Sequence, residues 1–361
     1  MRKNLFATTP GIIIVGAVIG LIAVWLQKLG NPANMGICVA CFERDVAGGL
    51  GLHRAAIVQY LRPEIMGLVL GSLAAAIATR EFKPRGGSAP IVRFVLGMIA
   101  AMGALVFLGC PWRAILRLAG GDGNAILGLA GLATGIWFGT LFFKKGYSLG
   151  RSNSQSVVSG ALFPVIVVCL LLLYLIFPQI PDQPQSGPLF YSVKGPGSQH
   201  APFIASLGLA FIIGIFAQRS RFCTMGAFRD LFLFRYTHLF LGLAAMFAAA
   251  FIANALTGGL KFGFEGQPVA HSDFLWNYLG MVTAGLAFAL AGGCPGRQLF
   301  MAGEGDSDAG IFALGMLVGA AMAHNLGTAS SGTGIGVYGM QATIIGFAVC
   351  LIIGFVHSKK A

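Results

Sequence analysis

The sequence predicts an all-α polytopic membrane protein with about ten spans, arranged as two inverted five-span repeats with re-entrant cysteine-containing loops. Three observations lead to this fold class. Of the 361 residues, 56% are hydrophobic and only 10% are charged, whereas a soluble domain carries roughly 25% charged residues. Apolar stretches of about 20 residues recur, each long enough to cross the hydrocarbon of a bilayer. A cysteine pattern also occurs twice, at nearly the same spacing.

The candidate spans can be read in chain order from these apolar stretches. They lie at residues 9–28, 55–79, 90–109, 124–143, 157–177, 201–218, 236–256, 274–293, 308–326 and 336–357. The first is too long for the core of a signal peptide, so we expect it to be retained. The polar stretch Pro178–His200 is expected to be an extended connection. We therefore predict a first repeat over 1–180, a polar linker over 181–200 and an inverted second repeat over 201–361.

The basic residues of the short loops predict the orientation. With the N-terminus inside, the cytoplasmic segments collect Arg2, Lys3, Arg80, Lys83, Arg85, Lys144, Lys145, Arg151, Lys359 and Lys360. The opposite loops hold little beyond Lys194 and Lys261, apart from the motif arginines and a few neighbours. Positive charge accumulates on the cytoplasmic side of membrane proteins, so both termini are predicted to be cytoplasmic. The net charge of +12 also fits an anionic substrate, and anionic lipid accounts for part of it.

Internal comparison predicts the two repeats. The matching positions are Cys38 and Cys223, Arg44-Asp45 and Arg229-Asp230, Cys110 and Cys294, and Asp122 and Asp306. Cys110 follows Cys38 by 72 residues, and Cys294 follows Cys223 by 71. Because five spans is an odd number, the second copy must lie upside down relative to the first, as in many secondary transporters. The cysteine segments are expected to be re-entrant and to line a cavity.

The pattern Gly-Cys-Pro-x-Arg closes an apolar run in each half, at residues 109–113 and 293–297. Proline fits the first turn of a helix, which places Cys110 and Cys294 at the N-cap, where unpaired N–H groups and the helix dipole favour an anion. Arg113 and Arg297 would lie on the same helix face as the cysteine. A charge inside the membrane points to function. The alternative is a tight loop with a buried cysteine and a snorkelling arginine.

Cys38-Val-Ala-Cys41 is a C-x-x-C motif, but a structural zinc site needs four ligands. The second half has Gly226 where Cys41 would align, so we expect no metal, and no cofactor either. These thiols either line a permeation path or are small buried core residues. Cys169 and Cys350 lie inside ordinary spans, which favours a structural role.

Two further groups of charged residues leave alternatives open. Arg44 and Arg229 each precede an aspartate: they either form a salt-bridged cap or attract anions at each mouth of a path. Asp122 and Asp306 either neutralise the arginines of the Gly-Cys-Pro-x-Arg motifs or cap the next helix.

At these residues the sequence resembles the YeeE/YedE family of sulfur-compound transporters, and more closely its YedE branch. The resemblance rests on the cysteine and Arg-Asp segments and on the two Gly-Cys-Pro-x-Arg loops, and it runs through both halves. It implies an inner-membrane protein that takes up thiosulfate, or a related sulfur or selenium species, past a series of thiols. By matching motif these are Cys38 or Cys41, then Cys110, Cys223 and Cys294. It also implies a small cytoplasmic sulfurtransferase-like partner.

The predicted function is therefore a transporter or channel-like importer of a small sulfur- or selenium-containing anion, not an enzyme. Its partners would be the anion and the lipid bilayer, with no nucleic acid. The predicted substrate-binding residues are Cys38, Cys41, Arg44, Cys110, Arg113, Cys223, Arg229, Cys294 and Arg297. The alternative is a membrane sulfurtransferase or redox protein that forms persulfides on cysteine.

Overall fold

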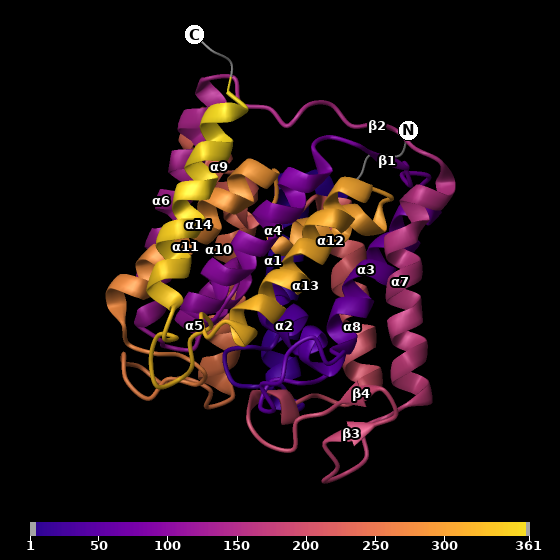
Figure 1. The fold of residues 1–361 in the computed structure, drawn as a ribbon, viewed down its shortest axis with the longest axis vertical. Helices are drawn as coiled ribbons and strands as arrows, with labels where there is room; N and C mark the ends of the chain where they lie inside the picture. Colours follow the sequence, from indigo (N-terminus) through magenta and orange to yellow (C-terminus); the bar gives the residue numbers. More distant parts are fainter. Residues whose placement is uncertain (1–4, 359–361) are drawn as a thin grey trace.

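The computed structural model describes residues 5–358, and this part of the chain is almost entirely helical (Figure 1). The longer helices are α1 (Thr9–Lys28), α3 (Pro63–Ala78), α4 (Pro90–Phe107), α6 (Asn124–Lys144), α7 (Val157–Ile176), α8 (Phe203–Ser220), α10 (His238–Leu256), α11 (Phe274–Ala291), α13 (Ser307–Asn325) and α14 (Gly339–Val356). Shorter helices lie between them: α2 (Val39–Gly49), α5 (Pro111–Ala119), α9 (Thr224–Phe234) and α12 (Pro295–Gly303). The all-α membrane fold class is confirmed.

Nine of the ten predicted spans coincide with helical segments that, within residues 5–358, are long and apolar enough to cross a membrane. The span predicted at 55–79 is wrong in length, because α3 has 16 residues and begins only at Pro63. Arg62 holds an extended conformation before the helix, and its side chain is fixed by an ion pair with Asp45. A helix of this length covers about 24 Å, so its apolar sequence ends short of a full crossing.

The long helices pack in pairs that join the two halves of the chain. Helix α1 packs on α10 and α8 packs on α3, while α4 packs on α13 and α11 packs on α6. If α1–α7 are matched in order with α8–α14, each of these pairs has its counterpart. The last helix of each half departs from the match, because α7 packs on α3 whereas α14 packs on α11 and α4. The inverted orientation of the second repeat stays a prediction.

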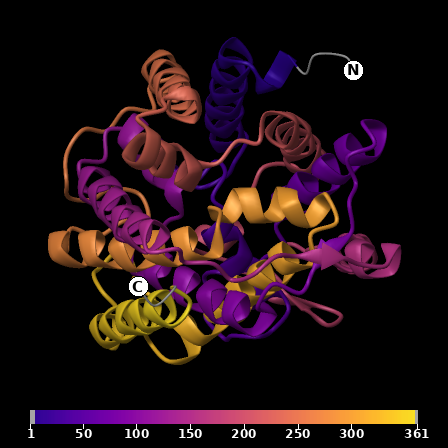
Figure 2. The ribbon, with the colours of Figure 1, turned by 90° about the horizontal axis from the view of Figure 1, so that it is seen from above.

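Small residues allow these helices to approach closely. A Cβ atom added to Gly135 of α6 would lie 2.1 Å from the carbonyl oxygen of Val282 of α11, and one added to Gly97 of α4 would lie 2.2 Å from that of Phe312 of α13. Only glycine fits such contacts, which are typical of helix packing in membranes. Seen from above, α1 (indigo) and α14 (yellow) lie at the periphery (Figure 2), with apolar side chains such as Ile344 and Ile352 exposed.

The polar connection between the halves is folded, not extended as expected. It contains the strands β3 (Gln185–Ser186) and β4 (Leu189–Phe190), paired as a hairpin, and the 3-10 helix η2 (Pro196–Ser198). Its backbone bonds to the loop before α3: Ser192 N donates to Gln59 O and Gly197 N donates to Ile57 O, both at 2.8 Å. The connection therefore covers the end of α2. A second pair of short strands, β1 (Arg85–Gly86) and β2 (Asn153–Ser154), lies at the opposite end of the molecule (Figure 1).

Candidate thiol path

Each of the short helices α2, α5, α9 and α12 begins directly after a cysteine. The N-cap residues are Cys38, Cys110, Cys223 and Cys294, each in extended conformation. The prediction for Cys110 and Cys294 is confirmed, with Pro111 and Pro295 opening their helices. Cys38 and Cys223 were not expected at caps, because no proline follows them. The common arrangement directs unpaired helical N–H groups toward the sulfur atoms.

Backbone breaks precede three of these cysteines. The residue two positions earlier is left-handed in each case: Leu108 with φ 63°, Arg221 with φ 57° and Gly292 with φ 87°. Such a conformation costs a non-glycine residue roughly 1–3 kcal/mol and concentrates at functional sites. It ends α4, α8 and α11 and turns the chain, so that the next helix starts inside the protein.

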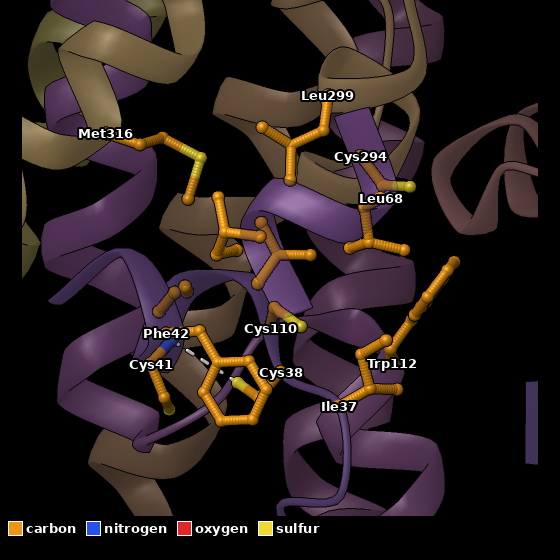
Figure 3. Close-up of a cluster of buried hydrophobic side chains, with 14 of the residues drawn as sticks. Ile37, Cys38, Cys41, Phe42, Leu68, Cys110, Trp112, Cys294, Leu299 and Met316 are labelled. Carbon is orange, nitrogen blue, oxygen red and sulfur yellow. Dashed lines mark hydrogen bonds between the residues drawn. The ribbon is translucent and has the colours of Figure 1, made fainter. Parts of the chain in front are cut away.

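The first thiol cluster consists of Cys38, Cys41 and Cys110 (Figure 3). All three side chains are at most 1% exposed. The Cys38 sulfur accepts from Cys41 N at 3.4 Å, and its thiol lies within hydrogen-bonding reach of the Cys41 and Cys110 thiols. The sulfur of Cys110 makes no cap hydrogen bond, but the N–H groups of Arg113 and Ala40 face it. The N-termini of α2 and α5 thus meet at one group of sulfur atoms.

The second thiol pair, Cys223 and Cys294, repeats this arrangement. The Cys223 sulfur accepts from Gly226 N at 3.2 Å, just as Cys38 accepts from Cys41. The Cys223 and Cys294 thiols interact directly, and the N–H groups of Arg297 and Thr224 face the Cys294 sulfur. The N-termini of α9 and α12 therefore meet at this pair. In Figure 1 these two helices lie toward the end with the chain termini, whereas α2 and α5 lie toward the other end.

Arg113 is completely buried beside the first thiol cluster. Its guanidinium donates to the carbonyl oxygens of Asn34 at 3.3 Å, Val269 at 2.9 Å and Leu108, and to the Cys41 sulfur at 3.4 Å. No ion pair with a carboxylate involves Arg113 within the described part of the chain. A full positive charge held only by dipoles leaves this cluster attractive to an anion.

Arg297, its counterpart, lies at the wall of an open cavity of about 330 Å³. The cavity also reaches Cys223, Arg221, Arg229 and His238. Arg297 pairs with Glu304 at 3.1 Å, a residue seven positions along, so a check for helical spacing would have found this partner. One thiol group is therefore sealed, while the other borders a cavity rich in arginine.

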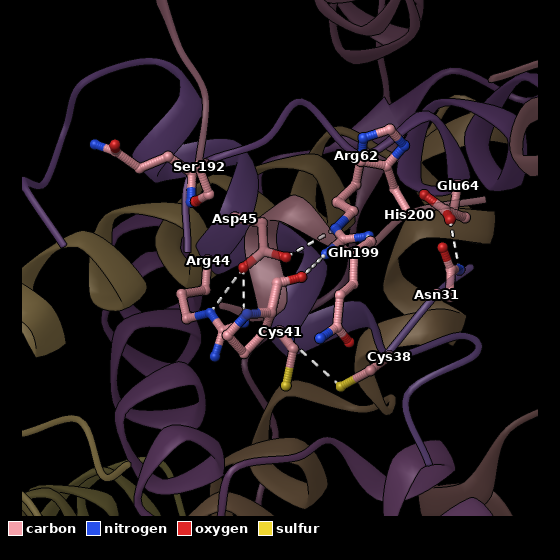
Figure 4. A network of polar contacts seen from close by, with 12 residues as sticks. Asn31, Cys38, Cys41, Arg44, Asp45, Arg62, Glu64, Ser192, Gln199 and His200 are labelled. Carbon is pink, nitrogen blue, oxygen red and sulfur yellow. Dashed lines mark hydrogen bonds and ion pairs between the residues drawn. The ribbon is translucent and has the colours of Figure 1, made fainter. Parts of the chain in front are cut away.

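Both Arg-Asp segments form salt bridges, as one of the two interpretations predicted. Arg44 pairs with Asp45 at 2.7 Å inside the protein, and Arg229 pairs with Asp230 at 2.7 Å with 36% of its side chain exposed. Figure 4 shows that Asp45 also binds Arg62, a residue that no sequence motif marks. Arg44 is buried and does not lie at a mouth, whereas Arg229 borders the cavity.

The aspartates after the motifs do not neutralise the motif arginines. Asp122 pairs with Arg117 at 2.6 Å, and Asp306 pairs with Arg85 at 2.7 Å. Asp306 also caps α13 by accepting from Ala309 N at 3.0 Å, which confirms the other alternative for this residue. The two aspartates do not neutralise the motif arginines, because the turn after each short helix places the carboxylate beside a different guanidinium group. Cys169 is exposed and Cys350 is buried within ordinary helices.

Parts of this chain are similar to known proteins of sulfur transport. A family model described as sulphur transport matches residues 219–354, from just before Cys223 through most of α14. The thiosulfate transporter TsuA of Spirochaeta thermophila is 32% identical over 106 residues, which cover 29% of this chain. The match spans about a third, 32%, of the length of that curated relative. Both matches cover only part of the chain, and the family match contains Cys223, Cys294 and the second Gly-Cys-Pro-x-Arg motif, so this part of the chain is similar to sulphur transport proteins.

Proposed function

We propose that this protein transports a small sulfur-containing anion across a membrane, along a path between the first thiol cluster and the second thiol pair. The observation that carries the proposal is the double convergence of helix N-termini on cysteine sulfur atoms. Helix N-termini bind anions through free N–H groups and the helix dipole. The relative that is a thiosulfate transporter supports a thiosulfate-like substrate.

The chemistry of the path suits a dianion that must not be held tightly. Moving bare charge into hydrocarbon is prohibitive, and Arg113 supplies an uncompensated positive charge at the sealed cluster. Thiols are weak donors, so they solvate sulfur and oxygen atoms without binding them strongly. Several weak sites in series let an ion enter and also leave.

The membrane location, the orientation and the partner of the protein are proposed from the sequence. We place the protein in the inner membrane with cytoplasmic termini, so that the arginine-lined cavity faces the cytoplasm and the first cluster faces outward. The repeats would then be inverted about the membrane plane. A selenium analogue of the anion remains a candidate substrate, and a small sulfurtransferase-like protein would receive the cargo at the cavity.

The decisive experiment is uptake of 35S-thiosulfate into proteoliposomes. Cys110→Ala and Cys294→Ala should each lower the initial rate at least about tenfold, since each removes one station of the path. Cys169→Ala is the matched control, because its side chain is exposed on α7, and it should leave the rate unchanged. Selenosulfate and sulfate as competitors define the substrate class. Unchanged uptake in both path variants would refute the thiol path.

A second function, sulfur transfer by a membrane enzyme, is favoured by the grouping of three buried cysteines, Cys38, Cys41 and Cys110, at the N-termini of α2 and α5. A cysteine thiolate would attack the outer sulfur of thiosulfate, the S–S bond to the sulfonate would break, and sulfite would leave with that electron pair, so that a cysteine persulfide remains. Sulfite release and a mass increase of one sulfur atom on a Cys38–Cys41 peptide would support this function. Bare thiols during turnover would exclude it.

A further inference from the structure

Trp112 reaches from the first Gly-Cys-Pro-x-Arg motif into the second. Its side chain is 1% exposed and starts from the first turn of α5, between Cys110 and Arg113. A Cβ atom added to Gly296 would lie 3.2 Å from Trp112 Cζ2 and 3.4 Å from its Cε2. The indole therefore lies against the first turn of α12, next to Cys294.

Aromatic rings from the second half complete the surroundings of this indole. The ring of Phe222, the residue before Cys223, has its centroid 5.8 Å from that of Trp112, and the ring of Phe300 lies at 6.0 Å. Phe222 and Phe300 are themselves fully buried. Trp112 thus joins the first turn of α5, which begins at Cys110, to the first turn of α12 and to the residue before Cys223. Figure 3 shows Trp112, Cys110 and Cys294 in this region.

The indole N–H is buried without an acceptor in the part of the chain that the structure describes. An unsatisfied buried donor costs roughly 1–3 kcal/mol, so its presence calls for a reason. The ring atoms nearest the Cβ position of Gly296 are Cζ2, Cε2 and Cη2, so the six-membered ring of the indole faces α12, and Nε1 is bonded to Cε2 at the side of this contact. The hydroxyl of Thr224, completely buried in the first turn of α9, likewise has no partner among the described residues. Two unpaired donors therefore lie close to the second thiol pair.

We propose that Trp112 is the central gate of the path: its ring separates the two thiol groups, and its N–H is a hydrogen-bond donor for the anion that passes between them. The proposal rests on the proposed transport function. Tryptophan is a donor only, so it presents no lone pair that would repel a dianion. Its counterpart at the same motif position is Gly296, whose missing side chain makes room for the ring. The pairing of the largest and the smallest residue explains why the two motifs differ at this position.

The gate can be tested by thiol labelling, which needs no transport. An anionic methanethiosulfonate reagent is added to detergent-solubilised protein in a Cys169→Ala background, and modified peptides are quantified by mass spectrometry. In the parent protein Cys223 should be modified from the cavity while Cys110 is protected. Trp112→Ala should raise the labelling rate of Cys110 at least about tenfold, because the partition is removed, and Trp112→Phe should not. An unchanged Cys110 rate in correctly folded Trp112→Ala would overturn the gate.

The donor role is tested separately by 35S-thiosulfate uptake. Trp112→Phe keeps an aromatic ring but lacks the N–H, and should lower uptake about tenfold, as expected for a lost hydrogen bond to a charged ligand. Trp137→Phe is the matched control, because Trp137 lies on α6 with 45% of its side chain exposed. Uptake by Trp112→Phe equal to that of the parent would overturn the donor role. If the parent protein itself carries no thiosulfate, transport fails, while the labelling result still decides the gate.

If Trp112→Ala does not fold, Gly296→Ala tests the same contact with a smaller change. Its methyl group would press on the Cε2–Cζ2 edge of the indole, and the ring must shift to admit it. We expect faster labelling of Cys110 than in the parent protein, and Gly208→Ala, which meets nothing within 4 Å, serves as the control. Equal rates in both variants would contradict the gate.

Discussion

The carboxylate of Asp45 joins two buried arginines: Oδ1 accepts from Arg44 at 2.7 Å and Oδ2 accepts from Arg62 at 2.7 Å (Figure 4). Arg62 also donates to the carbonyl oxygens of Gln199 at 2.9 Å and Pro196 at 2.8 Å. One carboxylate therefore connects α2, the start of α3 and the polar connection. This network closes the side of the protein on which the first thiol cluster lies.

Asp45→Asn should lower the free energy of unfolding by about 3–5 kcal/mol, because it leaves two buried guanidinium groups without their counter-charge. Asp230→Asn removes the corresponding carboxylate from a partly exposed pair, and should cost only about 0–1 kcal/mol. Thermal unfolding of the two variants in the same detergent provides the comparison. Equal losses of stability would contradict a dominant role for the buried network.

The membrane fold could be predicted because each long helix is apolar over its whole length, and no distant contact is needed to recognise it. The N-cap positions of Cys110 and Cys294 followed from the local chemistry of the proline after each. Ion pairs were harder to predict. Asp122 lies nine residues after Arg113 but pairs with Arg117, because helix geometry and the turn after α5 decide which guanidinium it meets.

Other features depend on residues far apart in the sequence. The carbonyl oxygens that hold Arg113 include that of Val269, in the connection between α10 and α11, where no motif marks it. The cavity beside Cys223 and the folded cover above α2 arise from packing between the halves. Trp112 and Gly296 were visible only as the variable position of a repeated motif, and their contact appears only in three dimensions.

Arg113→Lys should reduce thiosulfate uptake by about tenfold to a hundredfold, because an ammonium group cannot reproduce the planar fork that binds several carbonyls at once. Arg297→Lys should stay within about threefold of the parent rate, since Arg297 has Glu304 as its partner and a cavity into which a flexible ammonium extends. Initial uptake rates, normalised to the amount of folded protein, test both. An equal fall in the two variants would contradict the difference between the sealed and open sites.

Gly135→Ala should destabilise the protein by about 1–3 kcal/mol, because the new methyl group would clash with a backbone carbonyl of α11 that cannot move alone. Gly208→Ala on α8 is the control: nothing lies within 4 Å of the added Cβ atom, and alanine is a better helix former by roughly 1 kcal/mol. The two variants should therefore shift the unfolding temperature in opposite directions. A similar shift in both would show that the α6–α11 contact tolerates a side chain.

His200 should make the folded connection sensitive to acid. Burial, together with the nearby Arg62, lowers the pKa of His200 below its ordinary value of 6.5. Its ring stacks on Tyr60 with centroids 4.3 Å apart, and its Nε2 lies 2.8 Å from Gln179 Oε1. As the pH falls below about 6.5, the unfolded chain binds a proton that the folded protein resists, so the free energy of unfolding decreases until the folded pKa is reached. Burial also lowers the pKa of His53 and His271. Both residues therefore also decrease the free energy of unfolding as the pH falls.

His200→Phe isolates this contribution, because phenylalanine preserves a ring against Tyr60 and does not titrate. The unfolding temperature of each protein is measured at about pH 7.5 and about pH 5.5, a range that spans the unfolded histidine pKa. The parent protein should lose more stability on acidification than His200→Phe does, while His53 and His271 still supply a residual loss in the variant. The variant is compared with itself at the two pH values, so any uniform cost of losing the bond to Gln179 cancels. An equal acid-induced loss in both proteins would show that His200 does not carry the pH dependence.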